Sequence, residues 1–196
     1  MIKRKDYFFK KAKREGYLAR SSYKLIELNR KYNLIRNYSD VLDIGCSPGS
    51  WVQVCLKLKA RRIVGIDIET AKVKDKKFEF VNEDIGEIDV AKLGKFDVVL
   101  SDISPKTKGF FDAEESTDLS RKAWKVAKKV LKPGGNFLCK IFQGAEFDAF
   151  SREIRKHFSF FKISKPKASR KESREMYLIG KGFLVSKPSE DKKIYK

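Results

Sequence analysis

Hydrophobic residues follow two periods along the chain, one typical of buried strands and one typical of helices. Short apolar runs cover residues 40–45, 62–67, 78–82, 96–102 and 136–142, which is the length of a buried strand. Helical spacing predicts helices over residues 6–14, 21–32, 50–58, 112–131 and 147–157. Two more apolar runs, 158–165 and 176–182, close the chain with only a loop between them. The pattern therefore predicts seven strands and several helices.

Strands that alternate with helices predict an α/β fold, a mostly parallel sheet with helices on both faces. Because only a loop separates the last two strands, we expect them to pair antiparallel at one edge. Ligands of such sheets bind outside the carboxyl ends of the strands. The polar residues at these ends are Asp43, Asp67, Asp84, Asp102 and Lys140.

Charge is distributed unevenly over the 196 residues, which carry 45 Lys and Arg against 26 Asp and Glu. Residues 1–36 have a net charge of +9, residues 37–154 only +1, and residues 155–175 +6. An enrichment of surface charge like that of thermophilic proteins would give similar numbers of acidic and basic residues, and only residues 37–154 show this balance. The basic flanks favour an anionic partner, nucleic acid before a membrane. We expect one domain over residues 37–182, a basic helical segment (1–36) packed on it, and a flexible basic tail (183–196).

Several other protein classes do not fit this composition. No apolar run reaches the ~18 residues that span a bilayer, and no apolar segment follows the basic start as in a signal peptide. The three cysteines, Cys46, Cys55 and Cys139, lack the spacing of a disulfide framework or a zinc site. They fit a reducing, cytoplasmic compartment. The single histidine, His157, gives little support to a triad or to a metal site.

A glycine-containing loop, residues 43–51, follows the first predicted strand and opens a helix. Gly45 and Gly49 allow a close backbone approach to a ligand, and Asp67 can bind the two hydroxyls of a ribose. The G-x-x-x-G spacing differs from the G-x-G-x-x-G of dinucleotide sites, and the carboxylates of Asp43 and Asp84 suit a cationic ligand better than a pyrophosphate. We therefore favour S-adenosylmethionine over a nicotinamide cofactor. The alternative is a loop whose glycines serve only the turn.

Five ordered segments resemble the FtsJ/RrmJ family of S-adenosylmethionine-dependent RNA ribose 2′-O-methyltransferases: residues 43–51, 101–105, 131–135, 140–144 and 165–177. Residues 20–25, R-S-S-Y-K-L, resemble the family's N-terminal lysine motif. The resemblance covers about residues 17–180. It implies a Rossmann-like class I methyltransferase fold, with residues 37–182 as the methyltransferase domain.

The resemblance also implies site residues. Its catalytic Lys-Asp-Lys-Glu tetrad corresponds to Lys24, Asp102, Lys140 and Glu175. Its cofactor residues correspond to Gly49, Trp51, Asp67 and Asp84, to which the loop adds Gly45 and the position between the two sites adds Asp102. Ser50 and Lys106 depart from the family pattern, which puts in doubt the freedom of the loop and the contacts to substrate. No metal is implied.

The resemblance makes Lys140 the proton acceptor for the ribose hydroxyl. A free lysine is an ammonium at neutral pH, so a basic Lys140 requires burial or a nearby positive charge such as Lys24. Asp102 and Glu175 act in the opposite direction. Alternatively, Lys140 only orients the hydroxyl and stabilises the developing negative charge. Lys24 could also be an ordinary lysine of a basic helix, and Glu175 a surface residue.

The expected substrate is a uridine of large-subunit ribosomal RNA, as in the most similar branch of the family, and we expect a monomer. Alternatives are a 2′-O-methyltransferase of the tRNA anticodon loop, a non-catalytic RNA-binding ribosome-assembly factor, and a nucleotide-dependent oxidoreductase. Aromatic residues alternate with cations in the first segment, among them Tyr7, Phe8, Phe9 and Tyr17. They could stack on RNA bases or pack on the core, and the sequence does not separate these interpretations.

Overall fold

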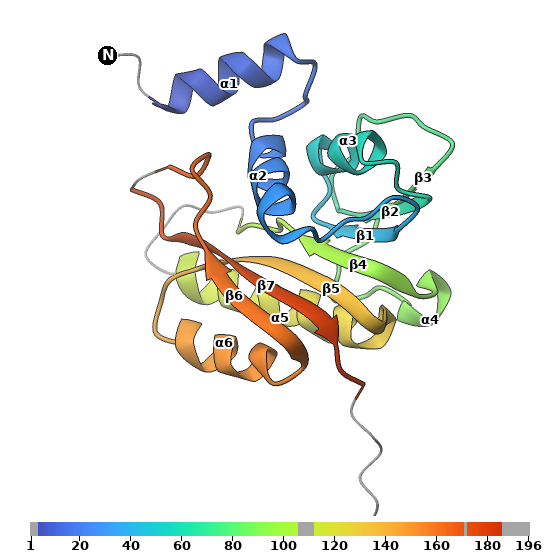
Figure 1. The fold of residues 1–196 in the computed structure, drawn as a ribbon, viewed down its shortest axis with the longest axis vertical. Coiled ribbons are helices and arrows are strands. Elements are labelled where there is room, and N and C mark those ends of the chain that lie inside the picture. The colour runs from blue at the N-terminus through green and yellow to red at the C-terminus, as the bar shows by residue number, and fades with distance from the viewer. Residues whose placement is uncertain (1–3, 106–111, 171, 186–196) are drawn as a thin grey trace, which may run out of the picture.

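The structure is a computed structural model that describes residues 4–105, 112–170 and 172–185. Seven strands form one sheet in the order β3-β2-β1-β4-β5-β7-β6 (Figure 1). The strands are β1 (Asp40–Ile44), β2 (Arg62–Ile66), β3 (Phe78–Val81), β4 (Phe96–Ser101), β5 (Leu131–Phe142), β6 (Phe158–Ser164) and β7 (Glu175–Phe183).

The first five strands pair parallel with one another, whereas β7 is antiparallel to both β5 and β6. The predicted fold class, a mostly parallel α/β sheet with antiparallel pairing of the last two strands, is confirmed. The reversed strand β7 lies one place in from the edge, which β6 occupies. This insertion brings the amino end of β7 next to the carboxyl end of β5.

Helices cover both faces of the sheet (Figure 1). They are α1 (Arg4–Arg14), α2 (Ser22–Tyr32), α3 (Ser50–Lys57), α4 (Val90–Leu93), α5 (Asp112–Val130) and α6 (Phe147–Arg155). One apolar core joins α2 and α3 to one face of the sheet, and a second joins α5 and α6 to the other. Since side chains of a strand alternate between faces, Val41 belongs to the first core and Leu42 to the second.

Two elements differ from the sequence prediction. Strand β5 begins at Leu131 and includes residues 133–135, although a Pro-Gly-Gly segment predicts a break. Leu131 pairs with Phe96, and the ladder resumes at Asn136 after a register shift, so the segment forms an irregularity within the strand. The four-residue helix α4 was not predicted, and Asp89 caps it by accepting a hydrogen bond from the N–H of Ala91.

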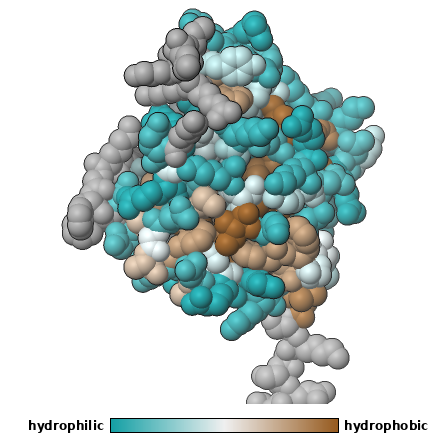
Figure 2. Space-filling model, turned by 60° about the vertical axis from the view of Figure 1, so that its left-hand side comes forward, coloured by the Kyte–Doolittle hydropathy of each residue, from teal (hydrophilic) through white to brown (hydrophobic). Residues whose placement is uncertain are grey.

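Hydrophilic residues dominate the face in Figure 2, and hydrophobic residues gather in a small area near its centre. Within the described part of the chain, no helix is both long and apolar enough to cross a membrane. Helix α1 lies outside the three layers, near the start of α2 (Figure 1). Its contact with the rest of the molecule is a small cluster in which Ala12 meets Tyr23 of α2 and Ala168 of the β6–β7 loop.

Candidate active site

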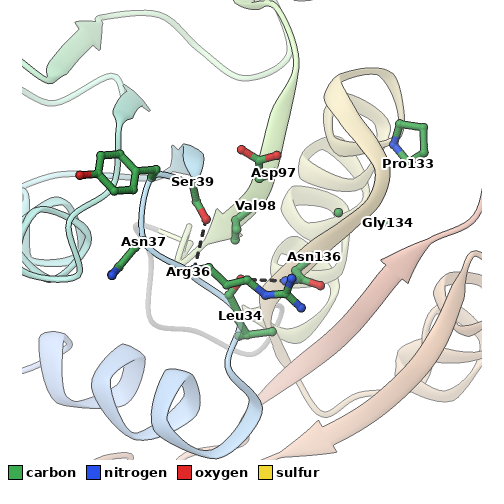
Figure 3. A pocket seen from close by; sticks show the side chains of 11 residues that line it. Leu34, Arg36, Asn37, Ser39, Asp97, Val98, Pro133, Gly134 and Asn136 are labelled. Atoms are coloured by element: carbon green, nitrogen blue, oxygen red, sulfur yellow. Dashed lines mark hydrogen bonds between the residues drawn. The ribbon is translucent and has the colours of Figure 1, made fainter.

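A cavity of about 280 Å³ opens at the amino ends of β1, β4 and β5, where Arg36, Asp97 and Asn136 contribute to its lining (Figure 3). The predicted site residues lie at the opposite, carboxyl end of the sheet. Asp102 directly follows β4, and Asp43 lies near the end of β1. This is the edge at which open α/β sheets bind their ligands.

The antiparallel pairing of β5 and β7 brings two predicted catalytic residues together. Lys140 of β5 is opposite Tyr177 of β7, and Phe142 is opposite Glu175. Because side chains two residues apart on a strand point to the same face, Glu175 and Tyr177 share one face of β7. Residues 35 positions apart in the sequence thus meet through strand register.

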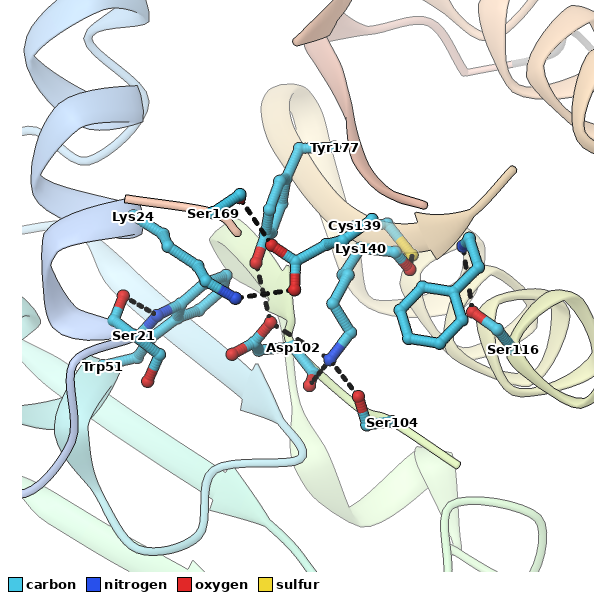
Figure 4. Close-up of polar contacts among 12 residues, drawn as sticks. Ser21, Lys24, Trp51, Asp102, Ser104, Ser116, Cys139, Lys140, Ser169 and Tyr177 are labelled. Carbon is cyan, nitrogen blue, oxygen red and sulfur yellow. Dashed lines mark hydrogen bonds and ion pairs between the residues drawn. The ribbon is translucent and has the colours of Figure 1, made fainter. Parts of the chain in front are cut away.

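Three oxygen atoms surround the Nζ atom of Lys140 (Figure 4). Nζ donates to the backbone carbonyl of Asp102 at 2.5 Å and to Ser104 Oγ at 2.5 Å, and lies 3.2 Å from Asp102 Oδ1. The Lys140 side chain is only 4% exposed. Three acceptors match the three N–H bonds of an ammonium, so the resting contacts are those of a charged lysine.

The other predicted pair, Lys24 and Glu175, forms an ion pair close by. Lys24 Nζ donates to Glu175 Oε2 at 2.6 Å, and Ser169 Oγ donates to Glu175 Oε1 at 2.7 Å. Both side chains of the pair are mostly buried, at 13% and 10% exposure. Lys24 lies in the first turn of α2, so this pair connects α2 to the start of β7.

The carboxylate of Asp102 interacts electrostatically with both lysines of the site, Lys140 and Lys24. Burial alone would raise the pKa of its carboxyl group, but the charges of Lys140 and Lys24 and a hydrogen bond from Tyr177 hold that pKa below its ordinary value. Tyr177 donates to Asp102 Oδ1 at 2.9 Å. The structure therefore gathers all four predicted catalytic residues, Lys24, Asp102, Lys140 and Glu175, into one centre.

The glycine loop passes beside this centre with two backbone conformations that favour glycine. Gly45 has φ of +77°, and a Cβ atom there would lie 2.8 Å from the backbone of Ile103. Gly49 has φ of +110°, and a Cβ atom there would lie 2.5 Å from Val73. Glycine is needed at both positions because side chains are rare at such φ values and space is absent. The loop thus packs closely on the segment that follows β4.

Two predicted ligand carboxylates lie along the same edge. Asp67 accepts hydrogen bonds from the backbone N–H groups of Ser47 and Glu69, at 2.8 and 2.9 Å, which connects it to the glycine loop. Asp84 is exposed and accepts from the N–H of Gly86 at 2.7 Å. A carboxylate has about four acceptor positions, so neither set of contacts uses up the capacity of its group.

Trp51 lies at the start of α3 with its side chain buried. Its indole N–H donates to the carbonyl of Ser21 at 2.9 Å, and the ring lies 6.2 Å from that of Tyr177. The indole is therefore part of the protein interior and its N–H is already used, so this side-chain donor is not free for a ligand. Next to it, the hydroxyls of Ser50 and Ser21 share a hydrogen bond of 2.7 Å, which links the glycine loop to the beginning of α2.

Asp43 is a carboxylate of this edge without a hydrogen-bond partner among the described residues. Its side chain is fully buried, and neither carboxylate oxygen has a hydrogen-bond partner in the described structure. Burial raises the pKa of Asp43 well above its ordinary value, and the charges of Asp102 and Asp67 add to this effect. An orphaned buried carboxylate is costly unless a ligand completes it. A cationic ligand such as the sulfonium and amino group of S-adenosylmethionine fits this acidic edge.

Three further residues of the centre, Ser104, Ser169 and Tyr177, were not predicted from the sequence. All three lie inside motifs already singled out, and Tyr177 is two residues from Glu175 on the same strand face. Lys106, the departure from the family pattern after Asp102, lies outside the described residues. Within residues 4–105, 112–170 and 172–185, no group of three or more His, Cys, Asp or Glu residues could hold a metal ion.

A Rossmann-like sheet, a glycine loop and a lysine–carboxylate centre at the carboxyl edge define a methyltransferase-type site. The family profile described as FtsJ-like methyltransferase matches residues 17–183. The chain therefore belongs to the FtsJ-like methyltransferase family.

Individual relatives support this assignment. The chain is 45% identical over 190 residues to the ribosomal RNA large subunit methyltransferase E of Archaeoglobus fulgidus, covering 93% of this chain and 98% of that one. It is 42% identical to the protein of the same name from Methanothrix thermoacetophila, covering 97% and 77%. A Plasmodium falciparum chain described as a ribosomal RNA methyltransferase superposes with a TM-score of 0.75 at 28% identity, covering 86% and 99%.

Proposed function

We propose that the protein transfers a methyl group from S-adenosylmethionine to a ribose 2′-hydroxyl of large-subunit ribosomal RNA, at a uridine. The observation that carries the proposal is the buried Lys140–Asp102 pair, positioned beside the partnerless carboxylate of Asp43. The named activity of relatives that are 42–45% identical over nearly the whole chain supports the choice of substrate.

We assign the cofactor to the edge formed by Gly45, Gly49, Trp51, Asp67, Asp84 and Asp102. Asp67 would accept from the ribose hydroxyls, and the backbone N–H of Trp51 would contribute from the start of α3. Asp43 lies beneath this edge and would balance positive charge. When bound, S-adenosylmethionine supplies the methyl group on a sulfonium, whose positive charge favours the neutral form of a nearby lysine.

The proposed role of Lys140 is to orient the ribose hydroxyl and take its proton. The ribose oxygen would form its bond to the methyl carbon while the bond from that carbon to the sulfonium sulfur breaks, which leaves a neutral thioether. The hydroxyl proton would pass to Nζ, so Nζ must first release one proton of its resting ammonium to solvent. In the resting structure three acceptors occupy Nζ, so the ribose hydroxyl must replace one of them. Ser104 is the exposed partner, and we expect its hydroxyl to yield. The carboxylate of Asp102 would then stabilise the ammonium formed on Lys140, and the Lys24–Glu175 ion pair would keep fixed charges beside it.

The surroundings of the reaction fit the same proposal. Three free cysteines, Cys46, Cys55 and Cys139, are all buried, as expected of a protein of the reducing cytoplasm. A single domain with both basic flanks around one centre can act as a monomer.

Radiolabelled methyl transfer tests the proposal. The substrates are large ribosomal subunits, their protein-free RNA, and tRNA, each taken from cells lacking this enzyme. We expect incorporation into the large-subunit RNA at a uridine 2′-hydroxyl, and loss of incorporation with Lys140→Ala. Incorporation into tRNA alone would replace the substrate assignment, and no incorporation into any RNA would overturn the proposed activity.

A further inference from the structure

Helix α1 presents aromatic and cationic side chains to solvent that the proposed reaction does not use. Tyr7 and Phe9 are 53% and 61% exposed, while Phe8 and Ala12 pack toward Tyr23. The helix therefore has one face docked on the protein and another directed outward. The aromatic residues of this segment, ambiguous in sequence, separate into the two groups: Phe8 and Tyr17 contact the ring of Tyr23, whereas Tyr7 and Phe9 remain exposed.

The outward face combines charge and rings in a regular order. Lys10 and Lys13 are three residues apart and lie in its middle, opposite the docked Phe8 and Ala12. Phe9 lies beside Lys13 at the i,i+4 spacing, and Tyr7 lies beside Lys10 at the i,i+3 spacing. In the described structure no ion pair is found for Lys10 or Lys13, whereas Lys11, on the docked side, pairs with Glu15.

The combination of exposed rings and cations on α1 fits nucleic acid better than a lipid surface. A helix that binds a membrane has one continuous apolar face. Here the two lysines lie between the exposed rings and interrupt the apolar surface. Binding sites for single-stranded RNA combine cations that contact phosphates with rings that stack on bases, which is the combination found on this face.

The contacts of α1 place this face in a fixed relation to the active centre. Gln53 of α3 holds the linker after α1 through Gly16 and Leu18, with both hydrogen bonds at 2.9 Å. Ala168, which packs against Ala12, precedes Ser169, the hydrogen-bond partner of Glu175. The helix is therefore connected to both sides of the catalytic centre.

We propose that the outward face of α1, formed by Tyr7, Phe9, Lys10 and Lys13, is a docking surface for the single-stranded RNA that flanks the target nucleotide. Bases stack on Phe9 and Tyr7, and phosphates contact Lys10 and Lys13. The inference rests on the proposed RNA substrate and extends it to a specific surface. Because this contact is equal before and during methyl transfer, it acts on RNA affinity and leaves the chemical step unchanged.

Fluorescence anisotropy with a short fluorescein-labelled oligouridylate tests the surface in the full-length protein. We expect Phe9→Ala to weaken binding about 5- to 150-fold, the range for loss of one base stack, and Phe9→Tyr to retain it. Replacing Lys10 and Lys13 by Gln should flatten the slope of log affinity against log salt by about 0.7 for each lysine. Tyr38→Ala and Lys92→Gln are matched controls, since both side chains are well exposed outside the proposed surface.

Other outcomes overturn the inference. Wild-type affinity in Phe9→Ala, with its cofactor binding and thermal unfolding intact, would show that no base stacks there. Loss of binding to anionic phosphatidylglycerol vesicles without loss of RNA affinity would assign the face to a membrane. A dimer of the wild type that Phe9→Ala dissociates in sedimentation velocity, with RNA affinity retained, would assign it to a second copy.

Methyl transfer to large-subunit RNA separates this inference from the proposed function. If the wild type transfers no methyl group while oligouridylate binding depends on Phe9, the proposed reaction fails and the docking surface stands. If Phe9→Ala methylates the RNA with wild-type KM, the docking surface fails and the reaction stands.

Discussion

The two ends of the sheet both contain buried aspartates, but they differ in whether these carboxylates have hydrogen-bond partners. At the amino end, Asp40 of β1 binds both Arg61 and Lys132, and Lys132 also binds Asp97. Three residues further along the same strand, the carboxylate of Asp43 has no hydrogen-bond partner in the described part of the chain. One strand thus carries a fully paired carboxylate at one end and an orphaned one at the other.

The difference separates charges that stabilise the fold from charges held for a ligand. The amino-end network is complete within the protein, and its Arg61 side chain is 62% exposed. Asp40 itself is buried, but its charge has partners within the protein, so this end requires no ligand. The carboxyl end instead keeps an uncompensated group in its interior, a cost that folding alone does not explain. The cavity in Figure 3 lies at the paired end, so shape alone would point to the wrong end.

The largest expected effect comes from removing Lys140 at the carboxyl end of the sheet, and removal of Lys132 at the amino end is its control. Lys140→Ala should lower the single-turnover rate of methyl transfer by about 10²–10⁴-fold, because it removes the group that orients and deprotonates the ribose hydroxyl. Lys132→Ala should leave that rate unchanged, since Lys132 binds carboxylates far from the reaction. Equal loss in both variants would mean that charge anywhere on the sheet matters, and the comparison would fail.

The next effect concerns the buried pair of Lys24 and Glu175. Glu175→Gln leaves the Lys24 ammonium mostly buried without its counter-charge, so we expect about 2–4 kcal/mol of lost stability and a rate reduced about 100-fold. Urea unfolding and single-turnover kinetics measure the two effects. Adding Lys24→Met to Glu175→Gln should recover much of the stability and none of the rate. If the double variant recovers activity as well, the pair serves the fold only.

The two aspartates of β1 should respond to pH with opposite signs. Burial, followed by the charges of Asp102 and Asp67, raises the pKa of Asp43, so the cofactor-free protein loses stability as pH rises toward that pKa. Asp43→Asn removes this loss, so the difference between the Tm of the variant and that of the wild type should become more positive as pH rises. Its affinity for S-adenosylmethionine should fall about 10-fold, the loss of one charge-assisted contact.

Asp40→Asn is the matched control on the same strand. Hydrogen bonds from Arg61, and then from Lys132, hold the pKa of Asp40 below its ordinary value although burial opposes them. The resulting stability is present above the unfolded-state pKa and is lost as pH falls through the folded-state pKa. The variant should therefore have a lower Tm than the wild type at neutral pH and match it in acid, with unchanged cofactor affinity in calorimetry. Parallel pH profiles for the two variants would contradict the comparison.

Sequence periodicity predicted most of the fold because β1 to β4 are short, largely apolar runs that a glycine or a polar residue follows. It misplaced the start of β5, since pairing of Leu131 with Phe96 overrides the local effect of Pro133 and the following glycines. It also could not place the reversed strand one position in from the edge. That order depends on contacts between β5 and β7 far apart in the sequence, to which local patterns are insensitive.

The candidate site divides in the same way. Strand ends predicted Asp43, Asp67 and Asp102, because polar residues there are conspicuous after apolar runs. Lys24 and Glu175 came only through the family resemblance, since nothing local distinguishes one lysine or glutamate among many. The contact of Ser104 with Lys140 depends on side-chain geometry, which a sequence pattern does not specify.

The smallest expected effect tests two buried serines, one at each end of the sheet. Ser50 occupies a position that departs from the family pattern, and its hydroxyl bonds to Ser21, directly before the helix that carries Lys24. Ser39, at the amino end, accepts from the N–H of Arg36 at 3.1 Å. Each loses one hydrogen bond on substitution by alanine, so both variants should unfold with about 1 kcal/mol less stability.

Only Ser50→Ala should also change the reaction, lowering the single-turnover rate about 2- to 3-fold, because it releases a contact that positions α2 relative to the glycine loop. Parallel urea titrations and single-turnover assays of the two alanine variants measure both quantities. A rate loss in Ser39→Ala as large as that in Ser50→Ala would show that any loosening of the sheet slows transfer. In that case the hydroxyl of Ser50 has no specific part in aligning Lys24 with the cofactor loop.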